Sequence, residues 1–96
     1  MKRHQPNRDD AEAIAIRALA FLAGEPERLQ RFLDLAGIAP DEIRVAAASP
    51  GFLAGVLDHI MSDEAVLLAF AANTGHAPEK LEAASRALAG RVADDV

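Results

Sequence analysis

The chain of 96 residues contains no cysteine, tryptophan or tyrosine and only four phenylalanines. Without cysteine it has no disulfide, no thiolate nucleophile and no thiolate ligand for zinc or an iron–sulfur cluster. No apolar run approaches the ~18 residues of a membrane-spanning helix, so we expect no membrane partner. A signal-peptide core is also lacking after the basic first residues. Together these absences favour a cytoplasmic location.

Positive charge is scarce outside the N-terminus. Lys2, Arg3 and Arg8 stand in the first eight residues, which leaves 7 basic against 15 acidic residues from residue 9 onward. A body this acidic repels phosphate backbones, so we expect no nucleic-acid partner. We predict a basic flexible tail over 1–8, a single helical domain over 9–90 and a C-terminal tail over 91–96.

Alanine dominates what is present: it is the most abundant residue type in a chain that is 51% hydrophobic. Alanine has the highest helix propensity of all residues. A chain of this length makes one domain with one core. Composition therefore favours a small all-α protein.

A short element occurs twice in the chain. The run from Gly37 to Ile43 (GIAPDEI) recurs as the run from Gly75 to Leu81 (GHAPEKL). We call the distance in sequence from Gly37 to Gly75 the repeat offset. In each copy a glycine is suited to end one helix and a proline to begin the next. We therefore predict a compact bundle of five or six short helices that contains a pseudo-duplicated helix–corner–helix unit.

The same signals place the individual helices. We expect them at about 8–23, 26–36, 40–48, 50–61, 64–74 and 78–88. The first is apolar on nearly all faces and is predicted to be the central, buried helix. The break between the fourth and fifth has no glycine or proline of its own; the duplication predicts it at Ser62-Asp63, with one of these residues as the cap.

Few side chains are candidates for chemistry. His59 and Asp63 are four residues apart, with Asp58 adjacent, and a helix continuing through them would place His59 and Asp63 on one face. Such a group could bind a divalent metal or act as an acid–base pair, but it supplies too few ligands for zinc, and a solvated ion pair is the simpler interpretation. We expect no metal or cofactor.

Two further features have both a structural and a functional interpretation. Arg17 is a charge in the middle of an otherwise apolar helix, where it could contact a polar partner or extend from the core edge to solvent. Gly51 and Gly55 have GxxxG spacing, which in a short helix favours close packing of a neighbouring helix. No nucleophile elbow, phosphate-binding glycine loop or HExxH motif is present.

Two long segments resemble a known family. The runs from Glu12 to Leu33 (EAIAIRALAFLA, then PERL and RFL) and from Asp63 to Phe70 (DEAVLLAF) are similar to a group of short bacterial proteins classified as domain of unknown function 3572. The resemblance covers about residues 9–88. It implies a small helical bacterial cytoplasmic protein and assigns no activity, cofactor or catalytic residue.

The function favoured by these features is a non-enzymatic protein–protein interaction module with a protein partner still to be identified. The high apolar content of so small a domain suggests that an apolar face remains exposed. A weak homodimer is an equally good expectation as a closed monomer. The alternative is a small metal-dependent or acid–base enzyme centred on His59 and Asp63.

Overall fold

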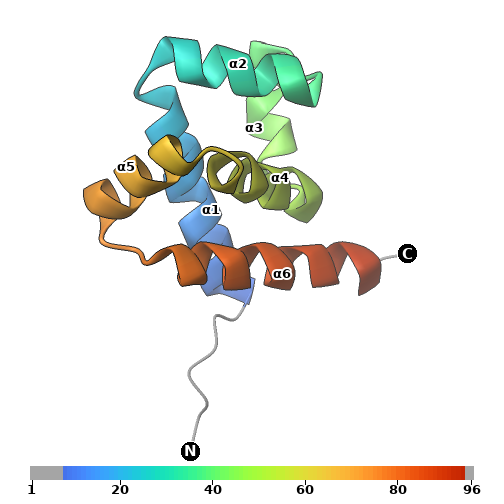
Figure 1. Ribbon diagram of the computed structural model, residues 1–96. Coiled ribbons are helices and arrows are strands. Elements are labelled where there is room, and N and C mark those ends of the chain that lie inside the picture. Colours follow the sequence, from blue (N-terminus) through green and yellow to red (C-terminus); the bar gives the residue numbers. More distant parts are fainter. Residues whose placement is uncertain (1–7, 95–96) are drawn as a thin grey trace, which may run out of the picture.

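The computed structural model describes residues 8–94 and contains helices without strands in that range. The elements, in chain order, are α1 (Arg8–Ala23), α2 (Pro26–Ala36), the 3₁₀ turn η1 (Pro40–Glu42), α3 (Ile43–Ala46), α4 (Pro50–Met61), α5 (Glu64–Thr74) and α6 (Pro78–Asp94). They form a compact bundle (Figure 1). The predicted all-α class is confirmed.

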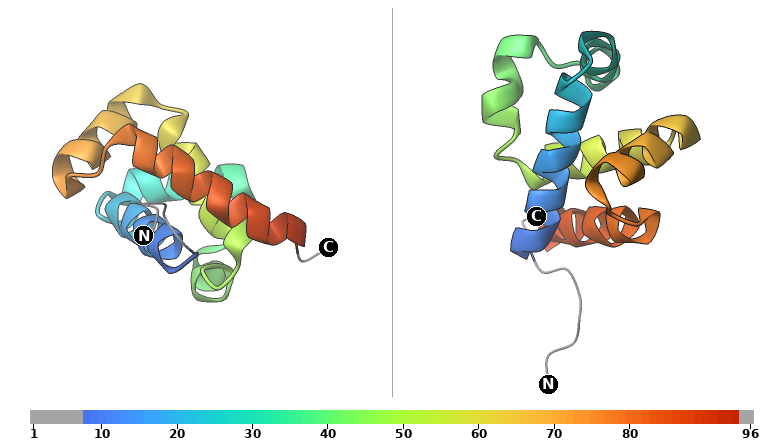
Figure 2. Two further views of the ribbon diagram at one scale, coloured as in Figure 1. Left: turned by 90° about the horizontal axis from the view of Figure 1, so that it is seen from below. Right: turned by 90° about the vertical axis from the view of Figure 1, so that its left-hand side faces the viewer.

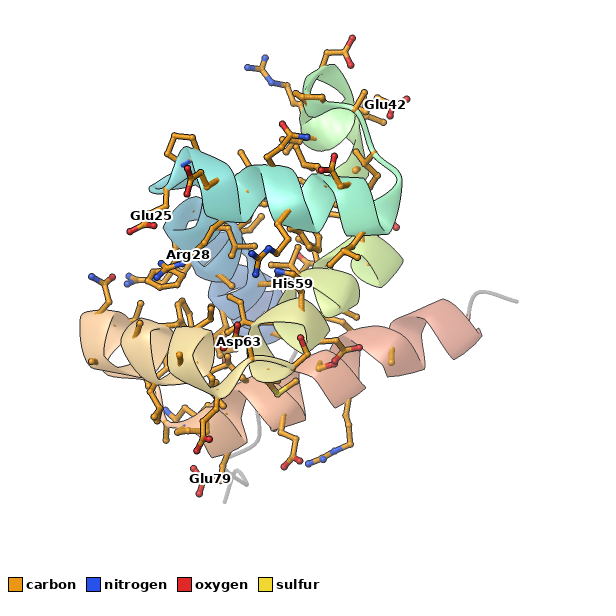
Figure 3. The ribbon with its side chains drawn as sticks, turned by 45° about the horizontal axis from the view of Figure 1, so that its top comes forward. Glu25, Arg28, Glu42, His59, Asp63 and Glu79 are labelled. Carbon is orange, nitrogen blue, oxygen red and sulfur yellow. The ribbon has the colours of Figure 1, made fainter. Side chains whose placement is uncertain are left out.

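Helix α4 lies at the centre of this bundle. It packs against α1, α2, α5 and α6 and lies between α2 and α6 (Figures 1 and 3). Its buried side chains are those of Leu53, Ala54, Val56, Leu57 and Ile60. They recur every three or four residues, so one side of the helix faces the core.

The prediction that α1 is the central helix is wrong. Only one side of α1 is buried, through Ala11, Ile14, Ala15, Ala18 and Leu22. On the other side Ile16 is 45% exposed, and Ala13, Arg17, Ala20 and Ala23 are also exposed. The physical reason is the small size of alanine: exposing it leaves little apolar area in water, so an alanine-rich helix is not required to be buried all round.

The two glycine corners form as predicted. Gly37 and Gly75 have φ values of 72° and 80°, in the left-handed region that glycine adopts without steric cost. Each donates its N–H to the carbonyl four residues earlier, Leu33 or Ala71, at 2.8 Å in both cases. The orphan carbonyls at the ends of α2 and α5 thereby gain partners.

The break after α4 also forms where the duplication predicts it. Asp63 is the cap of α5, and its carboxylate Oδ1 accepts from the N–H groups of Ala65 and Val66 at 3.0 and 3.3 Å. Its φ and ψ of −128° and 109° almost equal the −129° and 110° of Glu25, which lies one repeat offset earlier, before α2. Likewise Ser62 and Gly24 make matching backbone hydrogen bonds.

These matches extend the duplication beyond one corner. Helices α1, α2 and the segment η1–α3 correspond to α4, α5 and α6 at the same repeat offset. The third element differs between the two halves. We predicted a helix over 40–48, but the chain forms a 3₁₀ turn and a four-residue helix that bury no residue. Helix α6 instead continues to Asp94, past Leu88 where we expected it to end.

The two halves are joined by an exchange of ring contacts. Phe21, at the end of α1, packs edge-on against Phe70 of α5 with ring centroids 5.4 Å apart. At the corresponding positions, His59, at the end of α4, packs against Phe32 of α2 at 5.0 Å. The last turn of each half's first helix thus contacts the second helix of the other half.

The two predicted tails lie at the ends of the chain. The predicted tail over 1–8 lies, apart from Arg8, outside the described residues, as do the last two residues of the tail predicted over 91–96. Within 8–94 no helix combines the length and the apolar character needed to cross a bilayer.

We expect Gly75→Ala to lower the free energy of unfolding by about 1–2 kcal/mol, because a Cβ in the left-handed region clashes with its own backbone. Gly90→Ala is the matched control: it lies within α6, and a Cβ there meets open space. That variant should gain up to ~1 kcal/mol from helix propensity. Urea denaturation followed by circular dichroism measures both; equal effects of the two substitutions would contradict the assignment of the corner.

Candidate functional site

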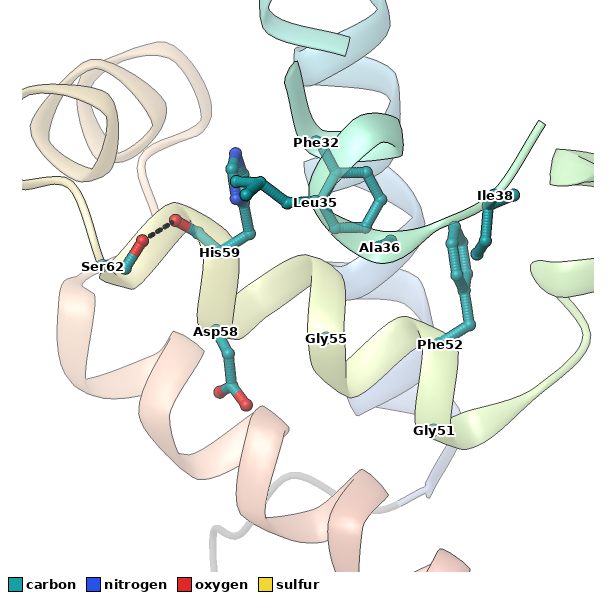
Figure 4. Close-up of a pocket in the computed structure, with 10 residues that line it drawn as sticks. All are labelled: Phe32, Leu35, Ala36, Ile38, Gly51, Phe52, Gly55, Asp58, His59 and Ser62. Carbon is teal, nitrogen blue, oxygen red and sulfur yellow. Dashed lines mark hydrogen bonds between the residues drawn. The ribbon is translucent and has the colours of Figure 1, made fainter. Parts of the chain in front are cut away.

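A groove of about 480 Å³ lies between α2 and α4 and is shallow and open along one side. Its walls are mostly apolar (Figure 4). The lining residues are Phe32, Leu35, Ala36, Ile38, Gly51, Phe52, Gly55, Asp58, His59 and Ser62. Leu35, at the edge, is 73% exposed, so it adds apolar surface in contact with water next to the other apolar side chains of the groove.

The groove exists because α4 has glycines where side chains would fill it. A Cβ built on Gly55 meets no atom within 4 Å. Both Gly55 and the exposed Gly51 line the open side of α4 and, contrary to our expectation, Gly55 does not form a close contact with a neighbouring helix in the described chain. The spacing of four residues places both on the same side of α4.

His59 lies at one end of the groove, directed toward α2 (Figures 3 and 4). Its ring packs against Phe32, and its main-chain carbonyl accepts a 2.7 Å hydrogen bond from the Ser62 hydroxyl. Partial burial, which disfavours the charged imidazolium, lowers the pKa of His59 from 6.5. The Arg31 charge lowers this pKa further, and Asp63 opposes the change.

Asp58 points away from His59, toward α6 (Figure 4). Its carboxylate accepts a 2.7 Å hydrogen bond from the hydroxyl of Ser85, which is 8% exposed on α6. Sequence reasoning missed this bond, because nothing in the local pattern relates residues 27 positions apart. Asp58 therefore joins two helices.

The third candidate, Asp63, is held by the cap of α5. The helix ends at Met61, so His59 and Asp63 are not on one continuous helical face. The three candidates thus point to three different partners: a phenylalanine ring, a serine hydroxyl and backbone N–H groups. Among the described residues no group of three or more His, Asp or Glu side chains is placed to hold a metal ion.

Arg17 lies on the exposed side of α1, and its side chain reaches solvent. It is separate from the groove, whose lining comes from α2, α4 and the corner at Ile38. Its proposed contact with a polar partner stays a prediction.

We expect a double-mutant cycle of Asp58→Ala and Ser85→Ala to give a coupling energy of about 1–2 kcal/mol, because a nearly buried hydroxyl bonds a charged acceptor. The matched control is the exposed Gln30–Asp34 bond of 2.8 Å within α2. Its cycle should give only a few tenths of a kcal/mol. Chemical denaturation supplies all the values, and similar coupling in the two cycles would argue against a joining role for Asp58.

The lowered pKa of His59 predicts a pH dependence of stability. In the range between the folded-state pKa and 6.5, the unfolded chain binds more protons at this position than the folded chain. The contribution of neutral His59 is therefore complete above pH ~6.5 and is lost as the pH falls toward the folded-state pKa. We expect His59→Phe, which keeps a ring against Phe32, to reduce the fall in the urea midpoint between pH 7.5 and 5. An unchanged pH profile in this variant would show that His59 titrates alike in both states.

Comparison with known proteins identifies a family for the chain. No curated protein and no solved structure matches the chain. One family model, described as "Protein of unknown function (DUF3572)", matches residues 8–91, which include α1 to α5 and most of α6. The resemblance seen in the two sequence runs is confirmed, and the chain belongs to the DUF3572 family.

Proposed function

We propose that the chain is a non-enzymatic interaction module that binds an amphipathic helix of a partner protein in the groove between α2 and α4. The observation that carries this proposal is the apolar groove of about 480 Å³ with the largely exposed Leu35 at its edge. We further propose a bacterial cytoplasmic setting, which the family resemblance and the lack of cysteine support.

The form of the groove suits a helix. Helices pack with their axes roughly 8–10 Å apart, and the shortest separations need small residues in the contact. Gly51 and Gly55 supply a floor without side chains, while Phe52 and Leu35 stand at its sides. A partner helix with apolar residues at i, i+3 and i+4 would insert one row of side chains into this floor. A small ligand would leave much of its surface in water here, because the groove is shallow.

Charge near one end gives the partner an expected polarity. Arg31 is close enough to His59 to lower its pKa, so one positive charge lies near this end, while the nearby Asp63 carboxylate, which raises this pKa, is bonded to the N–H groups at the start of α5. Asp58 does not offset the Arg31 charge there, since its carboxylate is bonded to Ser85 on the other side of α4. The partner helix should therefore carry an acidic residue near this end.

The alternative enzyme centred on His59 and Asp63 gains no support from the geometry. An acid–base pair needs the two groups within hydrogen-bonding reach of one reacting atom. The Asp63 carboxylate is committed to the α5 cap, and His59 rests against Phe32. A docking groove uses His59 and Phe32 as lining residues and does not require them to converge with Asp63.

The test uses Gly55→Leu in the full chain. Leucine favours a helix more than glycine and would occupy open space, so we expect unfolding stability to rise by up to ~1 kcal/mol while helix binding is lost. The probe is a phage-displayed library of short amphipathic helices, selected on the wild-type chain. Binding of the selected helices should fall at least tenfold in Gly55→Leu and in Leu35→Glu.

The control is Leu68→Glu on α5. Like Leu35, Leu68 is exposed, at 55%, but it lies outside the groove. It should bind the selected helices like the wild type. Helices that bind Gly55→Leu unchanged would refute the groove as the binding site. A dimer that light scattering detects in the wild type and not in Gly55→Leu would show that a second copy is the occupant, in place of another protein.

A further inference from the structure

The duplication allows the surfaces of α1 and α4 to be compared position by position. On α4, one side packs against α6: Asp58 on that side, although itself exposed, accepts the Ser85 hydrogen bond. Ala54, one turn earlier on the same side, is 8% exposed. Helix α6 packs on both α4 and α1 in the described chain.

The corresponding side of α1 is uncovered. The positions one repeat offset before Asp58 and Ala54 are Ala20 and Ile16; Ala20 is exposed, and Ile16 is 45% exposed. We call this side, together with the exposed positions beside it, the outer face of α1; it consists of Ala13, Ile16, Arg17, Ala20 and Ala23, of which Ala13 and Arg17 correspond to Gly51 and Gly55 on the open side of α4. In the right-hand view of Figure 2, α1 stands upright with α3 on one side of it and α5 and α6 on the other.

The difference arises from the third element of each half. In the second half this element is α6, with 17 residues; in the first half it is η1 and the four-residue α3, after which the chain turns into α4. Helix α3 buries none of its residues. The first half therefore lacks a long helix of its own that would cover the outer face of α1, while α6 packs on the buried side of α1 and on α4.

We propose that the outer face of α1 binds a helix of another protein that resembles α6 in its apolar pattern. The pattern is that of Leu81, Ala84 and Leu88, which are fully buried on α6. A second copy of the chain cannot supply this helix from its own fold, because its α6 already uses that side against α4 and α1. The surface is distinct from the α2–α4 groove, so this site does not depend on the function proposed there.

Two residues define how the partner helix differs from α6. Ala20 occupies the position in α1 that corresponds to Asp58 in α4, so a partner helix meets no carboxylate there. The partner helix therefore carries a small apolar residue at the position that corresponds to Ser85 of α6. Arg17 is the single charge on the outer face, and a partner with an acidic residue beside it gains a complementary pair. The partner is thus an amphipathic helix with an apolar, alanine-containing side and an acidic flank.

The test uses two synthetic peptides with the sequence of residues 78–94, one unchanged and one with Ser85→Ala, titrated into the full ¹⁵N-labelled chain. Peptides of this length are mostly unfolded alone, so binding should appear together with helix formation. We expect saturable binding that shifts amide signals of the outer face, including Ile16 and Ala20. The wild-type chain should prefer the alanine peptide. The variant Ala20→Asp, which recreates the α4 surface, should prefer the serine peptide by about fivefold, as one added hydrogen bond of ~1 kcal/mol requires.

Ile16→Glu should lose binding of the peptides, while Leu68→Glu and Gly55→Leu should keep it. The last control separates this site from the groove, since Gly55→Leu closes only the groove. The proposal is overturned by any of three results: no binding at millimolar peptide, signal changes at Ala54 and Asp58 from exchange with the chain's own α6, or unchanged binding to Ile16→Glu.

Discussion

The fold depends on the reciprocal ring contacts between its halves. Phe21 packs on Phe70, and His59 packs on Phe32, so each half closes the other. Both phenylalanines that receive a ring are buried, at 4% exposure for Phe32 and 0% for Phe70. Pairs of this kind add about 0.5–1.5 kcal/mol each beyond the apolar area they bury. In a chain with only four phenylalanines, three of them take part in these two contacts, and the fourth, Phe52, packs on Phe32.

The two ring contacts between the halves lie at equivalent positions but differ in chemistry. At the first, the Arg28 guanidinium lies over the Phe21 ring, 5.0 Å from its centroid, which suits the negative face of the ring. At the second, a histidine takes the place of the phenylalanine, and the groove opens beside it. The ring contact made by the second half, which ends in the long helix α6, is thus polar and open. The ring contact made by the first half, which ends in the short α3, is closed by an apolar ring and a cation.

Much of the architecture could be predicted because it rests on local chemistry. Gly37, Gly75 and the prolines after them set the corners through their own backbone preferences, and the repeat offset located the cap at Asp63. The position of α1 could not be predicted, because alanine is compatible with both core and surface. The groove was missed for a related reason: it is defined by the side chains that Gly51 and Gly55 lack and by the approach of α2. The bond between Asp58 and Ser85 joins distant parts of the chain and has no local sign.

The exchange of rings also has a consequence for the order in which the chain is made. During synthesis α1 and α2 leave the ribosome first, but the partners of Phe21 and Phe32 lie in the second half, at Phe70 and His59. Until α4 and α5 have emerged, the rings of Phe21 and Phe32 in the first half have no partner ring to pack against. Local helices form in microseconds or less, whereas translation adds only ~5–20 residues per second. The first half therefore spends seconds as helices without a closed core, until α4 and α5 bring these partner rings and α6 packs on α1 and α4.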